Sequence, residues 1–164
     1  MPSFVTQSEN ASTPAASFDY VTTLSNWSMF AGRWPMPGIV SATAPQPLAL
    51  GVRVRVENTD GSVHHERVTA FEYGRRYAIR MELSPPASWL MQHIDEELVF
   101  EAAGEGTRVI RRFETVPRSA LTAPFVALIT PFLLRPAVEA HDRVVARALG
   151  YSSVPRNSTD ATPK

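Results

Sequence analysis

Alternating apolar and polar residues mark the middle of the chain as a series of β-strands. The clearest segment is 51–58 (GVRVRVEN), in which valines alternate with charged or polar side chains. A period of two residues buries one face of a strand and leaves the other in water. The same kind of pattern predicts further strands over 39–44, 63–71, 76–83, 89–101 and 107–116.

Turn signals between these segments indicate that neighbouring strands are antiparallel. Asp60-Gly61 follows the strand over 51–58, and the sequence GEG at 104–106 separates the last two strands. Short loops that contain glycine join strands as hairpins, and a succession of hairpins gives a meander.

The N-terminal part should supply one strand and two short helices. Residues 4–10 are expected to form the first strand. Thr13 is a suitable N-cap and Pro14 suits the first helical position, so a helix should begin there. A second helical turn is predicted over 26–30, and Gly32 ends it.

After Pro117 the apolar residues repeat with the helical period of about 3.6 residues. We expect a long helix that ends at Gly150 and that Pro131 and Pro136 kink or interrupt. Its apolar face is predicted to consist of Leu121, Phe125, Leu128, Phe132, Val138, His141, Val145 and Leu149. The apolar stretch 120–134 has about 15 residues. A membrane span needs roughly 20, so no integral membrane segment is expected.

This order of elements predicts one α+β domain. A chain of 164 residues fits a single domain, which can bury roughly 70% of its unfolded surface. We expect the domain to cover residues 1–150. The polar tail over 151–164 contains two prolines and has no apolar period, so it should be disordered.

Charge and composition exclude several classes of function. The 16 basic and 16 acidic residues cancel, which argues against a nucleic-acid binder and against a polybasic membrane-surface protein. The chain has no cysteine, so disulfides and thiolate chemistry are excluded. The N-terminal residues lack the basic and apolar regions of a signal peptide, and we expect a cytoplasmic protein. No nucleotide-binding or hydrolase motif is present, and no cofactor is expected.

Four short motifs, in the same order and at similar spacing, resemble the START-like superfamily. They are residues 13–20 (TPAASFDY), 25–30 (SNWSMF), 50–53 (LGVR) and 106–109 (GTRV). Within the superfamily they are most similar to the bacterial polyketide cyclase/dehydrase group, known as SRPBCC. The resemblance covers residues 3–150.

The resemblance implies a helix-grip fold: a curved, seven-stranded antiparallel sheet wrapped around the long C-terminal helix, with two short helices after the first strand. Between sheet and helix such proteins have a cavity for lipids, steroids, polyketides or other lipophilic molecules. Some members cyclise or dehydrate polyketides. Because one fold hosts many functions, the resemblance supports a cavity better than it supports a reaction.

Three polar residues are the candidates for chemistry in such a cavity. Glu96 shares its strand face with Leu98, and Arg111 shares its face with Phe113, so both should point inward. The turn at 104–106 places Arg111 roughly opposite Leu98 and diagonal to Glu96. The pair could orient a ligand's polar end or polarise a carbonyl; alternatively it is a structural ion pair. His141, on the apolar face of the long helix, is either a general acid or base or a core histidine.

The start of the strand over 63–71 contains residue types that can bind a metal: His64, His65 and Glu66. Neighbouring residues of a strand point to opposite faces, so His64 and Glu66 should point inward while His65 points outward. A third ligand would have to come from His93 or Asp95, and no ligand spacing supports this. We therefore expect no metal.

The expected partner is a small hydrophobic ligand, and the oligomeric state, monomer or homodimer, is left open. Core packing is the default interpretation for the large aromatic residues, and Trp89 and Phe125 are placed at the lip of the cavity. The predicted ligand-binding residues are Trp27, Phe30, Val54, Tyr77, Trp89, Leu98, Phe113, Phe125, Leu128 and Phe132.

Three functions are compatible with these residues. The leading hypothesis is the binding of a lipid-, polyketide- or aromatic-like molecule. The second is a polyketide cyclase or dehydratase that uses Glu96, Arg111 and His141. The third is a protein-interaction module of the same fold, which predicts an exposed apolar patch, for instance on the proline-broken helix.

Overall fold

The computed structural model describes residues 1–34 and 36–150, and the predicted tail over 151–164 lies outside the described residues. The described chain forms seven antiparallel strands in one sheet, in the order β1-β7-β6-β5-β4-β3-β2. In chain order the strands are β1 (Ser3–Asn10), β2 (Ile39–Thr43), β3 (Arg53–Asn58), β4 (Val63–Glu72), β5 (Arg76–Glu82), β6 (Met91–Ala103) and β7 (Gly106–Pro117).

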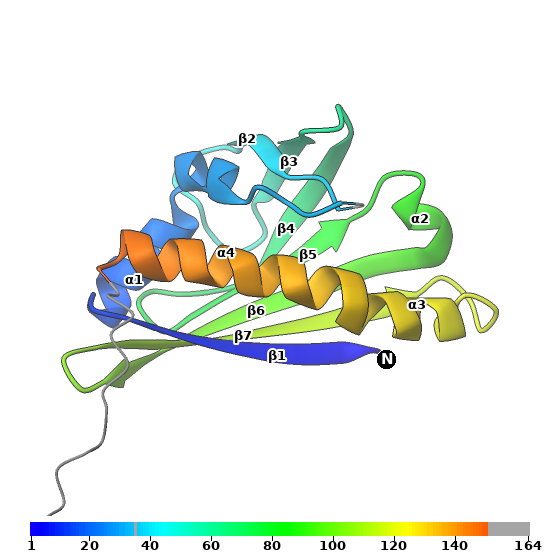
Figure 1. Ribbon diagram of the computed structural model, residues 1–164. Coiled ribbons are helices and arrows are strands. Elements are labelled where there is room, and N and C mark those ends of the chain that lie inside the picture. The colour runs from blue at the N-terminus through cyan, green and yellow to red at the C-terminus, as the bar shows by residue number, and fades with distance from the viewer. Residues whose placement is uncertain (35, 151–164) are drawn as a thin grey trace, which may run out of the picture.

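The helices lie between β1 and β2, between β5 and β6, and after β7. They are α1 (Pro14–Thr22), the 3₁₀ helix η1 (Leu24–Met29), α2 (Ala87–Leu90), α3 (Ala123–Ile129), the π-helical turn η2 (Thr130–Leu134) and α4 (Arg135–Ala148). Figure 1 shows α4 crossing one face of the curved sheet, with α1 on the same side. The predicted helix-grip architecture is therefore confirmed.

Local sequence signals explain where the elements begin and turn. The hydroxyl of Thr13 accepts a hydrogen bond from the backbone N–H of Ala16 at 3.2 Å, and Pro14 occupies the first turn of α1. Gly61 and Gly104 have φ angles of 81° and 60° in the two hairpin turns. This left-handed backbone conformation favours glycine, because a Cβ atom strains it.

Most buried apolar residues of the sheet belong to two groups, and Met81 packs against both. The first group includes Phe18, Val56 and Tyr77 and packs under α1 and η1. The second includes Phe113 and Val138 and packs under α4. Residues of both groups also line one cavity, so the hollow of the fold lies between them.

The segment before β6 differs from the prediction. We expected a strand from Trp89, but residues 87–90 form α2 and the strand begins at Met91. The backbone N–H of Ser88 donates to the carbonyl of Ser84, so the chain turns helically directly after Pro85-Pro86. Trp89 is 68% exposed as a result.

The predicted apolar face of the C-terminal helix is wrong in its first half. Phe125, Leu128 and Phe132 are 50%, 58% and 70% exposed, while Val126 and Thr130 are buried. Pro131 cannot donate a backbone hydrogen bond, and the chain forms a π-helical turn in which the N–H of Arg135 donates to the carbonyl of Thr130. The extra residue in this turn changes which face points to the sheet.

The long helix has a further property that is independent of its packing. By length and composition alone, residues 123–148 could cross a membrane. A helix that belongs to the core of a domain passes the same test, and here Val126, Thr130 and Val138 are buried on its inner side. In this fold the helix closes the cavity against the sheet.

Candidate functional site

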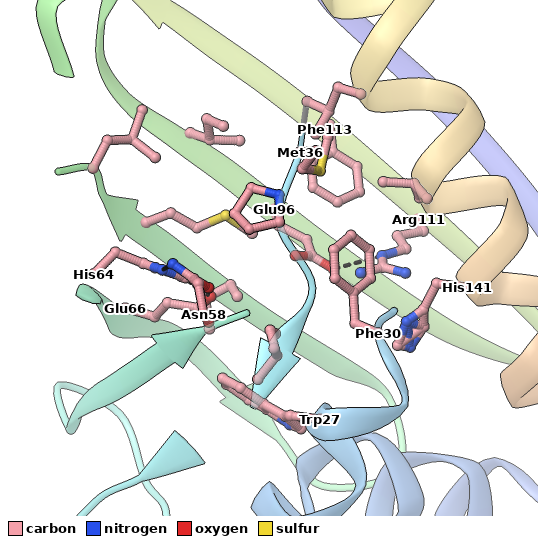
Figure 2. Close-up of a pocket in the computed structure, with 18 of the residues that line it drawn as sticks. Trp27, Phe30, Met36, Asn58, His64, Glu66, Glu96, Arg111, Phe113 and His141 are labelled. Carbon is pink, nitrogen blue, oxygen red and sulfur yellow. Dashed lines mark hydrogen bonds and ion pairs between the residues drawn. The ribbon is translucent and has the colours of Figure 1, made fainter. Parts of the chain in front are cut away.

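A cavity of about 480 Å³ lies between the sheet and the segments that cover it. Its wall is mainly apolar, and the strands contribute Ile79, Ile94, Leu98 and Phe113 to it. Figure 2 shows that polar side chains nevertheless reach this space from two sides: Glu66 and its neighbours on one, Arg111 and His141 on the other. These polar groups determine what the cavity can do.

Arg111 is the centre of the first polar group. Its Nε donates to Glu96 Oε1 at 2.5 Å and its Nη1 donates to Asp142 Oδ1 at 2.9 Å. The other oxygen of Asp142 accepts from the Thr6 hydroxyl at 2.6 Å. The guanidinium carbon also lies 5.1 Å from the ring centroid of Phe113. The group thus ties α4 to β1, β6 and β7.

The strand register explains why Glu96 and Arg111 meet. Leu98 lies opposite Arg111, and Glu96 lies opposite Phe113, so the two charged residues are diagonal neighbours on the inner face, as strand parity predicts. Burial raises the pKa of Glu96 above its ordinary value, although Arg111 opposes the shift. Burial alone would lower the pKa of Arg111, but the two carboxylates raise it, so the guanidinium stays charged.

His141 extends from α4 beside this group. Its ring lies against Phe30, with the ring centroids 5.3 Å apart. Its Nδ1 is buried and has no hydrogen-bond partner among the described residues. Burial, followed by the charge of Arg111, lowers its pKa from 6.5 to about 4, although Asp142 opposes this. The imidazole is therefore neutral at pH 7.

A second polar group lies on the other side of the cavity, on β3 and β4. Asn58 Nδ2 donates to His64 Nδ1 at 3.0 Å, and His64 Nε2 lies 3.0 Å from Glu66 Oε1. Because the amide nitrogen can only donate, His64 Nδ1 accepts this hydrogen bond. In this arrangement His64 Nε2–H donates a hydrogen bond to Glu66. Glu66 Oε2 is buried without a partner among the described residues.

Tyr77 lies on β5 near both glutamates. Its side chain is 1% exposed, and its hydroxyl has no partner among the described residues. Burial, Glu66 and Glu96, in that order, raise its pKa above the ordinary range. The phenol therefore stays protonated and can donate a hydrogen bond to a molecule in the cavity.

The structure places the predicted site residues in two sets. Eight of them line the cavity, and their roles in binding or catalysis remain predictions: Trp27, Phe30, Tyr77, Glu96, Leu98, Arg111, Phe113 and His141. Five lie outside the cavity wall, contrary to expectation: Val54, Trp89, Phe125, Leu128 and Phe132. Val54 is packed in the first core group, and the other four are exposed for the reasons given above.

Sequence reasoning missed two polar residues of the site, Asn58 and Asp142. Asp142 follows His141 and lies four residues after Val138, a spacing that places it on the inner side of a helix. Asn58, at the end of β3, has the same strand parity as Val54 and Val56, so the period of two could have placed it on the inner face. Glu66 and His64 point inward as strand parity predicts, but they form a hydrogen-bonded chain. Within the described residues, no three His, Asp or Glu side chains are arranged to hold a metal ion.

Comparison with known proteins identifies the family. Residues 1–149 match the family model described as "Polyketide cyclase / dehydrase and lipid transport". No curated protein matches the chain.

Solved structures share the fold at low sequence identity. Ara h 8.0201 is 12% identical with a TM-score of 0.67, covering 90% of this chain and 96% of that one. XoxI from Bacillus cereus is 15% identical with a TM-score of 0.66, covering 91% and 96%. Norcoclaurine synthase from Thalictrum flavum, a point mutant in complex with a transition-state analogue, is 8% identical with a TM-score of 0.65, covering 90% and 92%. The family match, together with the sheet and helix described above, assigns the chain to the polyketide cyclase/dehydrase and lipid-transport family.

Proposed function

We propose that this protein binds a small lipophilic molecule in the cavity between the sheet and α4. The observation that carries the proposal is a hollow of about 480 Å³ with a mainly apolar wall. Small-molecule sites are typically apolar cavities of about 300–1,000 Å³ with a few polar groups that fix orientation. Protein interiors are otherwise close-packed, so a space of this size between two core groups favours an occupant.

Dye binding tests this proposal directly. N-phenyl-1-naphthylamine is a neutral fluorophore that brightens in apolar surroundings, and we expect it to bind the protein in solution. Leu98→Trp, in the cavity wall opposite Arg111, should fill the space and weaken dye binding at least about tenfold. Native mass spectrometry after incubation with a lipid extract should then show the bound molecule.

The matched control is Val99→Trp, because Val99 is the next residue of β6 and points to the outer face. It should leave dye binding unchanged. Failure of the wild-type protein to bind the dye, or equal binding by Leu98→Trp, would contradict the proposal.

A second candidate function is cyclase or dehydratase chemistry in the same cavity. The observation in its favour is that Glu66, Tyr77 and His141 each keep an unpartnered polar atom in the described wall. A base that removes a proton next to a carbonyl, and a hydroxyl that donates to the developing oxyanion, are the groups such a reaction needs. Glu96 and Arg111 are less suited, because they bind each other.

Proton exchange distinguishes an enzyme from a binder. A short β-diketone in D₂O should gain deuterium at its central carbon faster with the protein present if the cavity performs this chemistry. Glu66→Gln should then abolish the acceleration. A protein that only binds its ligand leaves the exchange at the buffer rate.

The third candidate, an interaction module, is favoured by the exposed apolar side chains of α2, α3 and η2. Trp89, Phe125 and Phe132 are at least half exposed, and α2 contacts α3. Analytical ultracentrifugation of the wild type and of Phe125→Ser/Phe132→Ser tests self-association through this surface. If the dye binds in the cavity, the wild type and the double variant should bind it equally.

A further inference from the structure

We infer that the ligand's polar end is a hydrogen-bond donor, a hydroxyl or an ammonium group, that binds between Glu66 and Tyr77. The inference rests on the proposed binding function and specifies the chemical class of the ligand. Three observations carry it: a buried carboxylate with one unpartnered oxygen, an unpartnered hydroxyl on the same cavity wall, and an arginine, the one Lys or Arg of the described wall, that is already paired.

The first observation concerns the charge of Glu66. The residue is 3% exposed, and its ion-pair partner among the described residues is His64 alone. His64 is hydrogen-bonded to Asn58 through Nδ1 and to Glu66 Oε1 through Nε2, and no Lys or Arg of the described chain pairs with Glu66. A carboxylate buried without a cation is costly, unless another group supplies hydrogen bonds or positive charge.

The hydrogen-bonded chain also fixes where the unsatisfied oxygen points. Asn58 orients His64, and His64 holds Glu66 through Oε1. This leaves Oε2 as a buried acceptor with no partner in the described chain, and Glu66 belongs to the cavity wall. In Figure 2 these three side chains lie together at one side of the pocket. The arrangement presents a preorganised acceptor to a ligand.

Tyr77 adds a second polar atom to the same cavity wall. Its hydroxyl is buried and unpartnered in the described residues, and the charge of Glu66 acts on it. A hydroxyl can both donate and accept. A ligand alcohol or ammonium can therefore donate to Glu66 Oε2 and make a further hydrogen bond with Tyr77.

The charge of the wall excludes a carboxylate as the ligand's polar end. Asp60, Glu66, Glu96 and Asp142 line the cavity, and Arg111 is the one Lys or Arg in its described wall. Two of the guanidinium nitrogens of Arg111 already donate to Glu96 and Asp142. A fatty acid would thus bring a fifth carboxylate to a described wall whose one guanidinium is already paired, and like charges repel.

A matched set of ligands tests the inference. Decanol, decylamine and decanoate share one chain and differ in the end group, and each is titrated against bound N-phenyl-1-naphthylamine. We expect decylamine and decanol to displace the dye at concentrations at least about tenfold lower than decanoate, as one hydrogen bond to a charged group allows. If only decanol displaces the dye, the polar end of the ligand is a neutral hydroxyl. If only decylamine displaces it, the polar end is an ammonium group.

Two test variants, each with a matched control, show which residues cause the preference for a donor end group. Glu66→Gln keeps the shape and removes the charge, so the preference for decylamine over decanoate should shrink at least about tenfold. Glu101→Gln, an exposed glutamate of β6, is the control and should retain it. Tyr77→Phe should weaken decanol binding several-fold, while Tyr73→Phe, whose hydroxyl is at the surface, should not.

The possible failures are distinguishable. If the wild-type protein does not bind the dye, the proposed function itself is wrong. If the dye binds but decanoate displaces it as well as decylamine does, the proposed function stands and the inference is overturned. The inference is also overturned if Glu66→Gln binds the dye and keeps the full preference for decylamine over decanoate. Should Glu66→Gln not fold, the wild-type series and Tyr77→Phe decide the question.

Discussion

Tyr77 carries a hydroxyl that is buried without a partner among the described residues. Its ring packs edge-on against Phe18 and Phe71, with centroids 6.3 and 6.2 Å away, and a phenylalanine would make the same contacts. An unsatisfied buried hydroxyl costs about 1–3 kcal/mol. Stability therefore does not explain this hydroxyl, whereas a ligand that binds it does.

Tyr77→Phe should accordingly stabilise the ligand-free protein. We expect the free energy of unfolding to rise by about 1 kcal/mol, because the variant removes the desolvation cost and keeps the packing. Urea unfolding followed by circular dichroism measures the change. A loss of more than about 1 kcal/mol would indicate that the hydroxyl has a structural partner.

His141 should make the stability of the fold depend on pH. Its pKa is lowered from 6.5 to about 4, so the unfolded chain binds a proton between these values that the folded chain does not. Stability rises with pH wherever the unfolded state binds more protons. The contribution of His141 is thus fully present above pH 6.5 and is lost as the pH falls towards 4, by up to about 3 kcal/mol.

His141→Gln removes this titration, so its free energy of unfolding should fall less than that of the wild type between pH 6.5 and 4. Urea unfolding at pH 4, 5, 6, 7, 8 and 9 gives the two curves. Above pH 7 the curves should run parallel, which serves as the internal control. Parallel curves below pH 6.5 as well would mean that His141 is protonated normally in the fold.

At the scale of elements, the Arg111 group holds α4 onto the sheet. Asp142 on the helix bonds to Arg111 on β7 and to Thr6 on β1, and the side chains of Asp142 and Arg111 are each 12% exposed. Breaking one partner of a buried ion pair leaves a charge without compensation and typically costs about 3–5 kcal/mol. A paired surface charge contributes less than about 1 kcal/mol.

Asp142→Asn should therefore lower the free energy of unfolding by about 2–4 kcal/mol. This loss should be smaller than the loss expected if Arg111 had no carboxylate partner left, because Glu96 still binds Arg111. Glu139→Gln is the matched control on the same helix. Glu139 pairs with Arg135 at the surface, and its loss should cost no more than about 0.5 kcal/mol. Equal losses in the two variants, measured by urea unfolding, would show that the buried group does not anchor the helix.

The strands could be predicted from the sequence, but the inward face of the long helix could not. A strand alternates with a fixed period of two, so parity placed Glu66, Glu96 and Arg111 inward without knowledge of the fold. A helical face depends on an unbroken phase, and the π-helical turn at Thr130–Leu134 changes that phase. The large side chains of Phe125 and Phe132 lie on the outer side for this reason. Hydrogen-bond chains such as Asn58–His64–Glu66 depend on register, which separate segments do not specify.

At the scale of the whole molecule, the cavity separates the two core groups that an occupant would join. Tyr77 belongs to one group and Phe113 to the other, and both line the cavity. A ligand that touches both walls binds the folded state and not the unfolded chain. By mass action it then stabilises the fold, by about 2.7 kcal/mol at 100 times its dissociation constant.

Saturation with decanol or decylamine should consequently raise the melting temperature. For a domain of about 150 residues, 2.7 kcal/mol corresponds to a shift of about 5–10 °C, measured by differential scanning calorimetry at ligand concentrations set from the dye titrations. Leu98→Trp fills the space between the two groups and should show no shift at the same concentration, whereas Val99→Trp on the outer face should shift like the wild type. A ligand that displaces the dye from the wild type but leaves its melting temperature unchanged would bind outside the cavity, because binding between the two groups must stabilise the folded state.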